Sequence, residues 1–537
     1  MVEQASGSYP WWETGVIYQV YPRSFQDSNG DGIGDLNGIR ARLPYLKELG
    51  ISAIWISPIY PSPMVDFGYD VSDYTDIHPM FGTMQDFLDL TEEIHLRRMK
   101  VILDFVPNHT SNQHPWFLQS KSSRSNPKRH WYIWSDPKPD GSPPNNWVSF
   151  FGGSAWEWDH HTGQYYLHLF AKEQPDLNWR HPDVVMNMLN ALRFWLNRGV
   201  DGFRVDVIFL MIKDALLRDD TPNPDWTPAR PIIESTLHDR TSNQPEVHQI
   251  IKKMRVVIDE YDERVMIGEI YLPYKDLITY YGEQFDECHL PFNFGLIQRP
   301  FNAEAITSAV NEYEKLLPRG AWPNWVLGNH DQPRIASAKR AGANARLAQM
   351  LLLTLRGTPT MYYGDEIGMV NGQIPPDKYQ DPQARNEPGI AFSRDNVRTP
   401  MQWDNSVHAG FSTVEPWLPV NRDYTRRNVA AQREEANSFF QMVKELLAIR
   451  ASSVALNHGK YVFVSHGSDD VMAYLRIQGM VKLCIALNFS DEEKSVNLSS
   501  VAERARVMLS TEMDRRGETT LERLRLRPHE GVIMQVL

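Results

Sequence analysis

Eight short apolar runs, separated by longer polar segments of helical size, predict a closed (β/α)8 barrel for most of the chain. Strands that alternate with helices are expected to pair in parallel. No glycine-rich phosphate-binding fingerprint follows any of the runs, which favours a closed barrel over an open doubly wound sheet. The composition, 42% hydrophobic and 23% charged over 537 residues, is that of an ordinary globular protein.

The apolar runs are expected to be the barrel strands in chain order. They span residues 16–21, 53–59, 101–106, 202–207, 265–270, 287–292, 325–327 and 360–363. Polar segments that precede four of them are expected to be helices of the outer ring. These segments span residues 39–50, 84–99, 183–198 and 246–261.

Two long segments interrupt this alternation. Residues 108–175 are rich in Trp, Pro, Asn and Gly, which predicts a small irregular subdomain rather than a helix. Residues 365–435 are polar and contain prolines. Loops of such length are usually functional or disordered, and the aromatic residues of the first segment favour order.

The last part of the chain changes pattern. A helix at 437–455 is expected to close the barrel, and short alternating strands follow it at 461–465, 471–477, 482–488, 506–510 and 532–537. We therefore predict a barrel formed by residues 1–107 and 176–457, an inserted subdomain at 108–175 and a C-terminal β-sandwich at 458–537.

Charge and cysteine content limit the partners and the compartment. The formal net charge of −12 gives no electrostatic reason to bind nucleic acid or an anionic membrane. Residues 1–10 lack a basic and apolar signal, and no apolar run approaches the ~20 residues that span a bilayer. Cys288 and Cys484 are the only cysteines, which favours a reducing compartment. We expect a cytoplasmic monomer or homodimer without an organic cofactor, although a secreted chain with its signal removed would look similar.

Ionisable residues end several of the predicted strands, which is where barrel enzymes carry their chemistry. These residues are Asp104, His109, Arg204, Asp206, Glu269, His330 and Asp331. Arg204 and Asp206 are two residues apart, so a strand places them on one face. The guanidinium is expected to lower the pKa of Asp206 and keep it ionised.

Glu269 has apolar neighbours in the sequence, and burial among them is expected to raise its pKa, as a general acid requires. Neighbouring strands lie about 4.8 Å apart, close to the roughly 5–5.5 Å that separates the two carboxyl groups of retaining glycosidases. The pattern therefore indicates glycoside hydrolysis with retention. A single carboxylate at a strand end is more often a helix cap or a solvated group, and the combination is what favours catalysis.

A second group of oxygen-bearing residues lies in a glycine-rich loop after the first strand. Asp27, Asn29, Asp31 and Asp35 alternate with glycines, as the ligands of a hard cation such as Ca²⁺ or Mg²⁺ do. The loop begins like an EF-hand but lacks its glutamate in twelfth position. We expect one structural metal site, with a plain polar loop as the alternative.

Four segments resemble the signature segments of the α-amylase family of glycoside hydrolases, in the family order and over essentially the whole chain. They are Asp-Phe-Val-Pro-Asn-His (104–109), Gly-Phe-Arg-Val-Asp (202–206), Gly-Glu-Ile (268–270) and Asn-His-Asp-Gln-Pro-Arg (329–334). Segments 19–25, 66–70, 363–368 and 398–404 are similar to the α-glucosidase and oligo-1,6-glucosidase branch.

The resemblance implies roles for individual residues. Asp206 would be the nucleophile, Glu269 the acid and then the base, and Asp331 the third carboxylate. An Asp66–Arg398 pair would close the end of the pocket and make the enzyme exo-acting. The residues implied to line the glucose pocket are Asp66, Tyr69, His109, Phe151, Phe170, Arg204, Val207, His330 and Arg398. The residues that match the cation site of that branch are Asp27, Asn29, Asp31, Ile33 and Asp35.

Val207 directly follows the nucleophile. In the family, valine at this position tends to accompany activity on α-1,6 bonds, and threonine tends to accompany activity on α-1,4 bonds. Alternatively, valine simply suits a strand.

The resemblance implies an α-glucosidase that acts on short oligosaccharides of the maltose, isomaltose or sucrose type. A glucosyl transferase or isomerase of the trehalose-synthase or isomaltulose-synthase type would use the same intermediate. A non-catalytic transporter chaperone on this fold is disfavoured, because such relatives carry a membrane segment and lose carboxylates. The acidic segment 218–234 is left without a role.

Overall fold

The computed structural model describes residues 9–338 and 340–537, so residues 1–8, where no targeting signal was expected, lie outside the described part. Eight parallel strands close into a barrel in the order β1-β11-β10-β9-β8-β7-β3-β2, which confirms the predicted fold class. The strands are β1 (Ile17–Val20), β2 (Ala53–Ile56), β3 (Lys100–Phe105), β7 (Gly202–Val205), β8 (Val265–Gly268), β9 (Leu290–Asn293), β10 (Asn324–Val326) and β11 (Thr358–Tyr362). Each overlaps one of the predicted runs.

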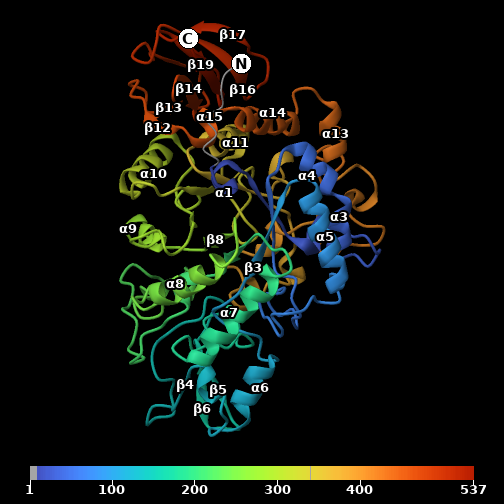
Figure 1. Ribbon diagram of the computed structural model, residues 1–537, viewed down its shortest axis with the longest axis vertical. Coiled ribbons are helices and arrows are strands. Elements are labelled where there is room, and N and C mark those ends of the chain that lie inside the picture. Colours follow the sequence, from blue (N-terminus) through green and yellow to red (C-terminus); the bar gives the residue numbers. More distant parts are fainter. Residues whose placement is uncertain (1–8, 339) are drawn as a thin grey trace.

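The helices cover the outside of the barrel (Figure 1). They include α3 (Leu36–Ala41), α4 (Leu43–Leu49), α5 (Met84–Leu96), α7 (Pro182–Leu196), α8 (Val247–Ile258), α10 (Ala303–Leu316), α11 (Ala345–Thr354) and α14 (Phe439–Ser452), which is followed by α15 (Val454–His458). The predicted helix at 39–50 is two helices, because Pro44 occupies the first turn of α4 and cannot continue α3. Thr83 and Asp86 form a capping box that starts α5 where the sequence predicted.

The inserted segment between β3 and β7 forms the lower part of Figure 1. It contains a three-stranded sheet of β4 (Trp134–Ser135), β6 (Gln164–Leu167) and β5 (Trp156–Asp159), in that order. The expectation of an irregular segment without a helix is wrong for α6 (Pro115–Ser122). Pro115 stands at the first helical position, and the His114 side chain accepts a hydrogen bond from Trp116 N–H, so the segment has its own helix start.

Two antiparallel sheets form the C-terminal part, at the top of Figure 1. The larger sheet has the order β12-β13-β14-β19-β16-β17, and β15 pairs with β18. The strands are β12 (Lys460–Phe463), β13 (Val471–Gln478), β14 (Val481–Asn488), β15 (Lys494–Val496), β16 (Arg504–Ser510), β17 (Gly517–Thr520), β18 (Leu524–Leu526) and β19 (Gly531–Val536). The three strands that the sequence did not predict are β15, β17 and β18, which have four residues or fewer.

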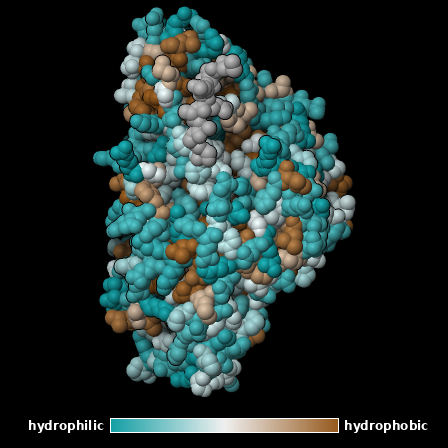
Figure 2. Space-filling view, viewed as in Figure 1, coloured by the Kyte–Doolittle hydropathy of each residue, from teal (hydrophilic) through white to brown (hydrophobic). Residues whose placement is uncertain are grey.

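The surface seen in Figure 2 is mostly hydrophilic, with hydrophobic residues in small groups. Within the described residues, no helix is long and apolar enough to cross a membrane.

Candidate active site

Side-chain alternation in the barrel strands directs the charged residues at the strand ends inward. In β3, Val101 and Leu103 belong to the core between the strands and the helices, whereas Ile102 belongs to the cluster inside the barrel. Asp104 is two residues after Ile102 and therefore faces the interior as well. It is fully buried.

The same alternation brings the two proposed catalytic carboxylates together. Val205 of β7 packs outward, so Arg204 and Asp206 point into the barrel. Val205 is paired in register with Gly268 of β8, so the next residues along the two strands, Asp206 and Glu269, are neighbours at the strand ends. The prediction that these carboxylates meet on adjacent strands is consistent with this register.

Arg204 is the centre of the carboxylate cluster. Its Nη1 lies 2.7 Å from Asp104 Oδ1 and 2.7 Å from Asp206 Oδ1. Its Nη2 lies 2.7 Å from Glu269 Oε2. Three buried carboxylates thus share one guanidinium, and its single positive charge cannot compensate all three in their ionised form.

The pKa of Asp206 is raised overall, so the expected net lowering is wrong, although Arg204 does act to lower this pKa. Burial raises the pKa first, and Arg204 opposes the rise while repulsion from Glu269 adds to it. Burial also raises the pKa of Glu269, as expected, and this carboxylate accepts a hydrogen bond of 2.8 Å from Val207 N–H. We infer that Asp206 and Glu269 together retain one proton.

Asp331 has the opposite electrostatic environment. Its Oδ1 lies 2.7 Å from Arg398 Nη2, and its Oδ2 lies 3.0 Å from His330 Nε2. Burial acts to raise the pKa of Asp331, but His330 and the nearby arginines outweigh it and lower the pKa well below the usual range. Gln19 Nε2 lies 2.8 Å from His330 Nδ1, so the imidazole, kept neutral by burial, has its proton on Nε2 toward Asp331.

The end of the pocket is closed by an ion pair that differs from the expected one. Asp66 Oδ1 lies 2.8 Å from Arg394 Nη2, not from Arg398. Arg394 also contacts Asp381 at 2.7 Å and Asp331 at 3.4 Å. Arg398 is fully buried behind Asp331 and donates to the His330 carbonyl. The prediction that Arg398 pairs with Asp66 is therefore wrong, because Arg394, one turn earlier, reaches the Asp66 carboxylate.

These side chains surround a cavity of about 490 Å³. The predicted site residues that line it are Asp66, Tyr69, His109, Phe151, Phe170, Asp206, Val207, Glu269, His330 and Asp331. Arg204 and Arg398 do not line it; they are buried beneath the carboxylates that they pair with. Both arginines therefore hold carboxylates of the pocket wall in position without facing the cavity.

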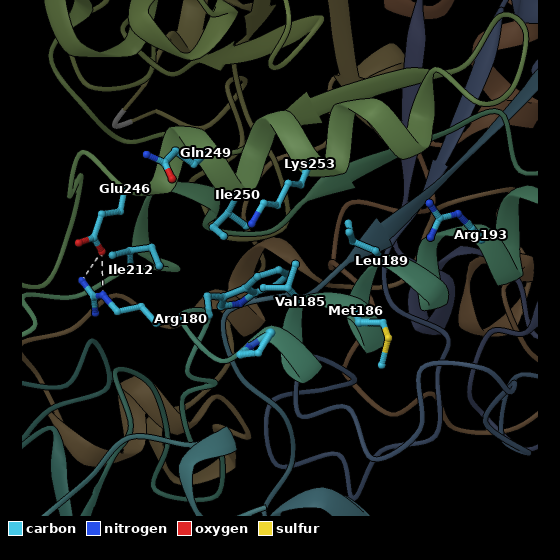
Figure 3. Close-up of a pocket in the computed structure, with 12 residues that line it drawn as sticks. Arg180, Val185, Met186, Leu189, Arg193, Ile212, Glu246, Gln249, Ile250 and Lys253 are labelled. Atoms are coloured by element: carbon cyan, nitrogen blue, oxygen red, sulfur yellow. Dashed lines mark hydrogen bonds and ion pairs between the residues drawn. The ribbon is translucent and has the colours of Figure 1, made fainter.

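A larger hollow of about 780 Å³ lies outside the barrel, between α7 and α8 (Figure 3). Arg180 and Glu246 pair at its edge, with Arg180 Nε 2.7 Å from Glu246 Oε2, and Val185 and Ile250 are among its apolar residues. The three carboxylates Asp206, Glu269 and Asp331 are all in the smaller cavity. The chemistry therefore belongs to the smaller cavity.

Comparison with known proteins shows the family to which the chain belongs. The family model "Alpha amylase, catalytic domain" matches residues 19–459. The chain belongs to the α-amylase family. Among its relatives in this family, a probable α-glucosidase of Rhizobium meliloti (strain 1021) is 41% identical over 91% of both chains. An oligo-1,6-glucosidase of Parageobacillus thermoglucosidasius is 38% identical over 98% of this chain and 99% of the relative. The crystal structure of the α-glucosyl transfer enzyme XgtA superposes with a TM-score of 0.92 at 38% identity, covering 99% of this chain and all of that one.

Several residues of this α-amylase family site were missed in the sequence. Arg394 precedes Arg398 by one turn in the same polar segment, so the sequence offered a second arginine as a possible partner for Asp66. No sequence pattern pointed to Gln174. Its Nε2 lies 3.2 Å from Asp66 Oδ2 and 3.1 Å from His109 Nε2, so it connects segments that are far apart in the chain. Ile233, within the unassigned segment 218–234, lines the cavity.

Val207 has a backbone conformation that the predicted strand does not allow. β7 ends at Val205, and Val207 is left-handed, with φ 34° and ψ 45°. A β-branched residue is strained there, by about 1–3 kcal/mol. The turn directs the Val207 N–H toward Glu269, so the strain is stored at a contact of the acid-base group.

The loop of the expected cation site is held by its own hydrogen bonds. Asp27 accepts from the backbone of Asn29, Gly30 and Gly32 and from Ser412 Oγ. Asp35 caps α3 by accepting from Gly38 N–H. Across the described part of the chain, no group of three or more His, Cys, Asp or Glu side chains is placed to hold a metal. The oxygen donors suit a hard cation, but the three aspartates do not converge, so the site stays a prediction.

Proposed function

We propose that the protein is a retaining, exo-acting α-glucosidase that releases glucose from the non-reducing end of short α-glucosides. The observation that carries the proposal is the pairing of Asp206 with Glu269 on adjacent strands, at a cavity closed by Asp66 and Arg394. The α-glucosidases and oligo-1,6-glucosidases among the relatives support it.

In the first step, the Asp206 carboxylate attacks the anomeric carbon of the bound glucose unit. The bond from that carbon to the glycosidic oxygen breaks, and Glu269 gives its proton to the leaving oxygen. The shared proton of the pair suits this division, because one carboxyl must be ionised and the other protonated. Asp331, with its lowered pKa, stays ionised and stabilises the positive charge that develops on the sugar ring.

In the second step, water attacks the anomeric carbon of the glucosyl ester. Glu269, now a carboxylate, takes a proton from the water, and the bond to Asp206 breaks. Each step inverts the anomeric carbon, so the two together return the α configuration. The hydrogen bond from Val207 N–H holds Glu269 in place for both steps.

The closed end supports removal of a single terminal glucose. Asp66 and Arg394 are both buried and paired there, and Gln174 fixes the second oxygen of Asp66. Charged groups at fixed positions can hydrogen-bond the hydroxyls of a terminal ring. A chain interior would have to pass through this ion pair, so starch is expected to be a poor substrate.

The test is a panel of glucose disaccharides and amylose, with the products followed over time. Glucose released one unit at a time from maltose, isomaltose or sucrose, with little attack on amylose, is the expected result. Internal cuts in amylose would contradict the exo-acting assignment. Failure to cleave any α-glucoside would contradict the proposal as a whole.

A second candidate function is glucosyl transfer or isomerisation, and the structural likeness to the α-glucosyl transfer enzyme XgtA favours keeping it. An acceptor hydroxyl replaces water in the second step, with the same proton transfer to Glu269. The same panel separates the two functions: lengthened or isomerised sugars in excess of free glucose indicate transfer, and free glucose in excess indicates hydrolysis.

A further inference from the structure

Arg23 is a buried cation without a carboxylate partner. It lies in the short helix α2 (Pro22–Phe25), just after β1, and only 7% of the residue is exposed. Buried charges are normally paired with an opposite charge, because water no longer stabilises them. Across the described residues, the guanidinium makes no ion pair with an Asp or Glu, and its Nε has no hydrogen-bond partner. Burial lowers the pKa of Arg23, as expected for a cation without a counter-charge.

Two methionine sulfurs stand where a carboxylate would be expected. Arg23 Nη1 donates to Met80 Sδ at 3.4 Å and to Met64 Sδ at 3.6 Å. Within the described part of the chain, these sulfurs are the only hydrogen-bond acceptors of the guanidinium. A thioether sulfur is a weak acceptor, so the charge of Arg23 is poorly compensated.

Aromatic rings hold the guanidinium in this position. Its Cζ lies 4.5 Å from the centroid of the Trp417 ring and 5.3 Å from that of the Phe67 ring. The centroids of the two rings are 5.5 Å apart. Contacts between a cation and aromatic rings fix the side chain without supplying a negative charge. The guanidinium therefore stays beside the two sulfurs.

The backbones of the two methionines are anchored as well. Met64 N–H donates to Ser62 Oγ at 2.9 Å, and Met80 N–H donates to His78 Nδ1 at 3.0 Å. Met64 has a φ of 65°, a left-handed conformation that is uncommon outside glycine. Both methionines are half-buried, so each keeps some surface that a small reagent can reach.

An oxygen added to either sulfur would meet the charge of Arg23. A sulfoxide oxygen is a polar acceptor, and hydrogen bonds from an ionised nitrogen donor are short, at about 2.7–2.9 Å. With Nη1 at 3.4 and 3.6 Å from the sulfurs, an oxygen to the side of either N–S line reaches that distance while the sulfur stays in place. In apolar surroundings the same oxygen would instead disrupt the packing.

We propose that Met64 and Met80 are a methionine-oxidation site whose sulfoxides are stabilised by Arg23. The oxidant is a peroxide, of which hydrogen peroxide is the simplest. A sulfur lone pair attacks one peroxide oxygen, so the S–O bond forms and the O–O bond breaks. The departing hydroxide takes the proton of the transferred oxygen and becomes water. The sulfur loses two electrons, and the peroxide gains them.

The site lies next to the closed end of the pocket, because Met64 is two residues before Asp66. Oxidation would add a strong hydrogen bond between this loop and α2. The modification is therefore expected to stabilise the protein at a position where methionine sulfoxide is usually harmful.

The test compares thermal unfolding of the full-length protein before and after treatment with hydrogen peroxide. The dose is one at which peptide mass spectrometry finds sulfoxide on Met84. This methionine is half-buried at the start of α5, and its sulfur has no hydrogen-bond partner among the described residues. A Met64→Leu/Met80→Leu double variant receives the same treatment, since leucine nearly conserves the volume of methionine.

The remaining methionines are common to both proteins, so the difference between their Tm shifts on oxidation reports positions 64 and 80. We expect sulfoxide at one or both positions in the wild type. Its Tm shift should be more positive than that of the double variant by roughly 1–3 °C, the effect of a hydrogen bond to a charged group in a chain of this length.

Met84→Leu is the matched control from the same part of the chain. Its Tm shift on oxidation should equal that of the wild type or be more positive, because the sulfoxide of Met84 meets no cation. Removal of Met64 and Met80 should change the shift in the opposite direction. If the double variant does not fold, the single variants Met64→Leu and Met80→Leu serve for the same comparison.

Two results would overturn the proposal. One is the absence of sulfoxide from both Met64 and Met80 at the dose that oxidises Met84. The other is a wild-type Tm shift equal to, or more negative than, that of the variants lacking these methionines. Both readouts, mass and Tm, are independent of whether the protein hydrolyses α-glucosides, so the proposed function is tested separately.

Discussion

Arg394 Nη2 lies 2.8 Å from Asp66 Oδ1 at the closed end of the pocket, and both side chains are buried. Arg394 also pairs with Asp381 and approaches Asp331, so one guanidinium links the closed end of the pocket to the third carboxylate of the site. The specificity for a terminal glucose and the stabilisation of the catalytic centre therefore depend on the same residue.

Arg394→Ala should impair both recognition and folding stability. Loss of hydrogen bonds between charged groups, worth about 1.5–3 kcal/mol each, is expected to lower kcat/KM for isomaltose roughly a hundredfold. Two buried aspartates are left without their partner, which costs about 3–5 kcal/mol of unfolding free energy. Steady-state kinetics and urea unfolding measure the two effects.

Arg193→Ala is the control, because Arg193 pairs with Glu260 at the surface and should change neither quantity by more than about 1 kcal/mol. A folded Arg394→Ala enzyme with normal kcat/KM would contradict the role given to the end of the pocket.

Val207→Thr tests the side chain beside the nucleophile. Threonine has nearly the shape of valine and adds a hydroxyl, so the left-handed turn and the bond from the backbone N–H to Glu269 should persist. We expect the ratio of kcat/KM for isomaltose to that for maltose to fall several-fold. A ratio equal to that of the wild type would show that the valine only fills space.

The barrel and the carboxylate cluster could be predicted because both follow from local rules. Alternation along the strands places Asp104, Asp206 and Glu269 inside the barrel whatever the loops do. The strand end was less predictable: the apolar run continues to Val207, but the chain leaves the strand after Val205.

The closed end of the pocket could not be assigned from local rules. Arg394 and Arg398 are four residues apart, and only the packing of their loop decides which of them reaches Asp66. Ile233 lines the pocket, whereas Gln174 bonds Asp66 without lining it, and both lie in long loops whose course depends on contacts with distant segments. The pKa of Asp206 was predicted in the wrong direction because its burial, and the sharing of Arg204 among three carboxylates, are tertiary features.

Asp365 is expected to make stability depend on pH. Burial raises its pKa to about 7, while an unfolded aspartate has a pKa of about 3.9. The folded state therefore holds the proton more tightly, so the stabilisation is complete below about pH 4 and is lost as the pH rises through about 7. Asparagine does not titrate, so Asp365→Asn should not lose stability as the pH rises. Its unfolding free energy should therefore increase by roughly 2–4 kcal/mol relative to that of the wild type between pH 4 and pH 8. Urea unfolding across this range measures it, and parallel curves for the two proteins would contradict the expectation.

The loop from Asp27 to Asp35 is expected to bind Ca²⁺ or Mg²⁺, with the ion stabilising the fold. An ion at a hundred times its Kd would add about 2.7 kcal/mol of stability, so a chelator should lower the Tm of the wild type. Asp31→Asn should lower the Tm in the presence of the ion and remove the response to the chelator. Purified protein that contains no divalent ion, and whose Tm does not respond to added Ca²⁺ or Mg²⁺, would contradict the site.

The double-displacement mechanism is tested most directly by trapping its intermediate. The fluoride ion of α-glucosyl fluoride leaves without protonation, so Glu269→Gln can still form the glucosyl ester. The variant lacks the base that activates water for the second step. The glucosyl ester should therefore accumulate, and mass spectrometry of proteolytic fragments should find one glucosyl unit on Asp206. Asp206→Asn is the matched variant and should carry none. A glucosyl unit on another residue, or turnover of the fluoride to β-glucose without any adduct, would contradict the assignment of Asp206 as the nucleophile of a retaining α-glucosidase.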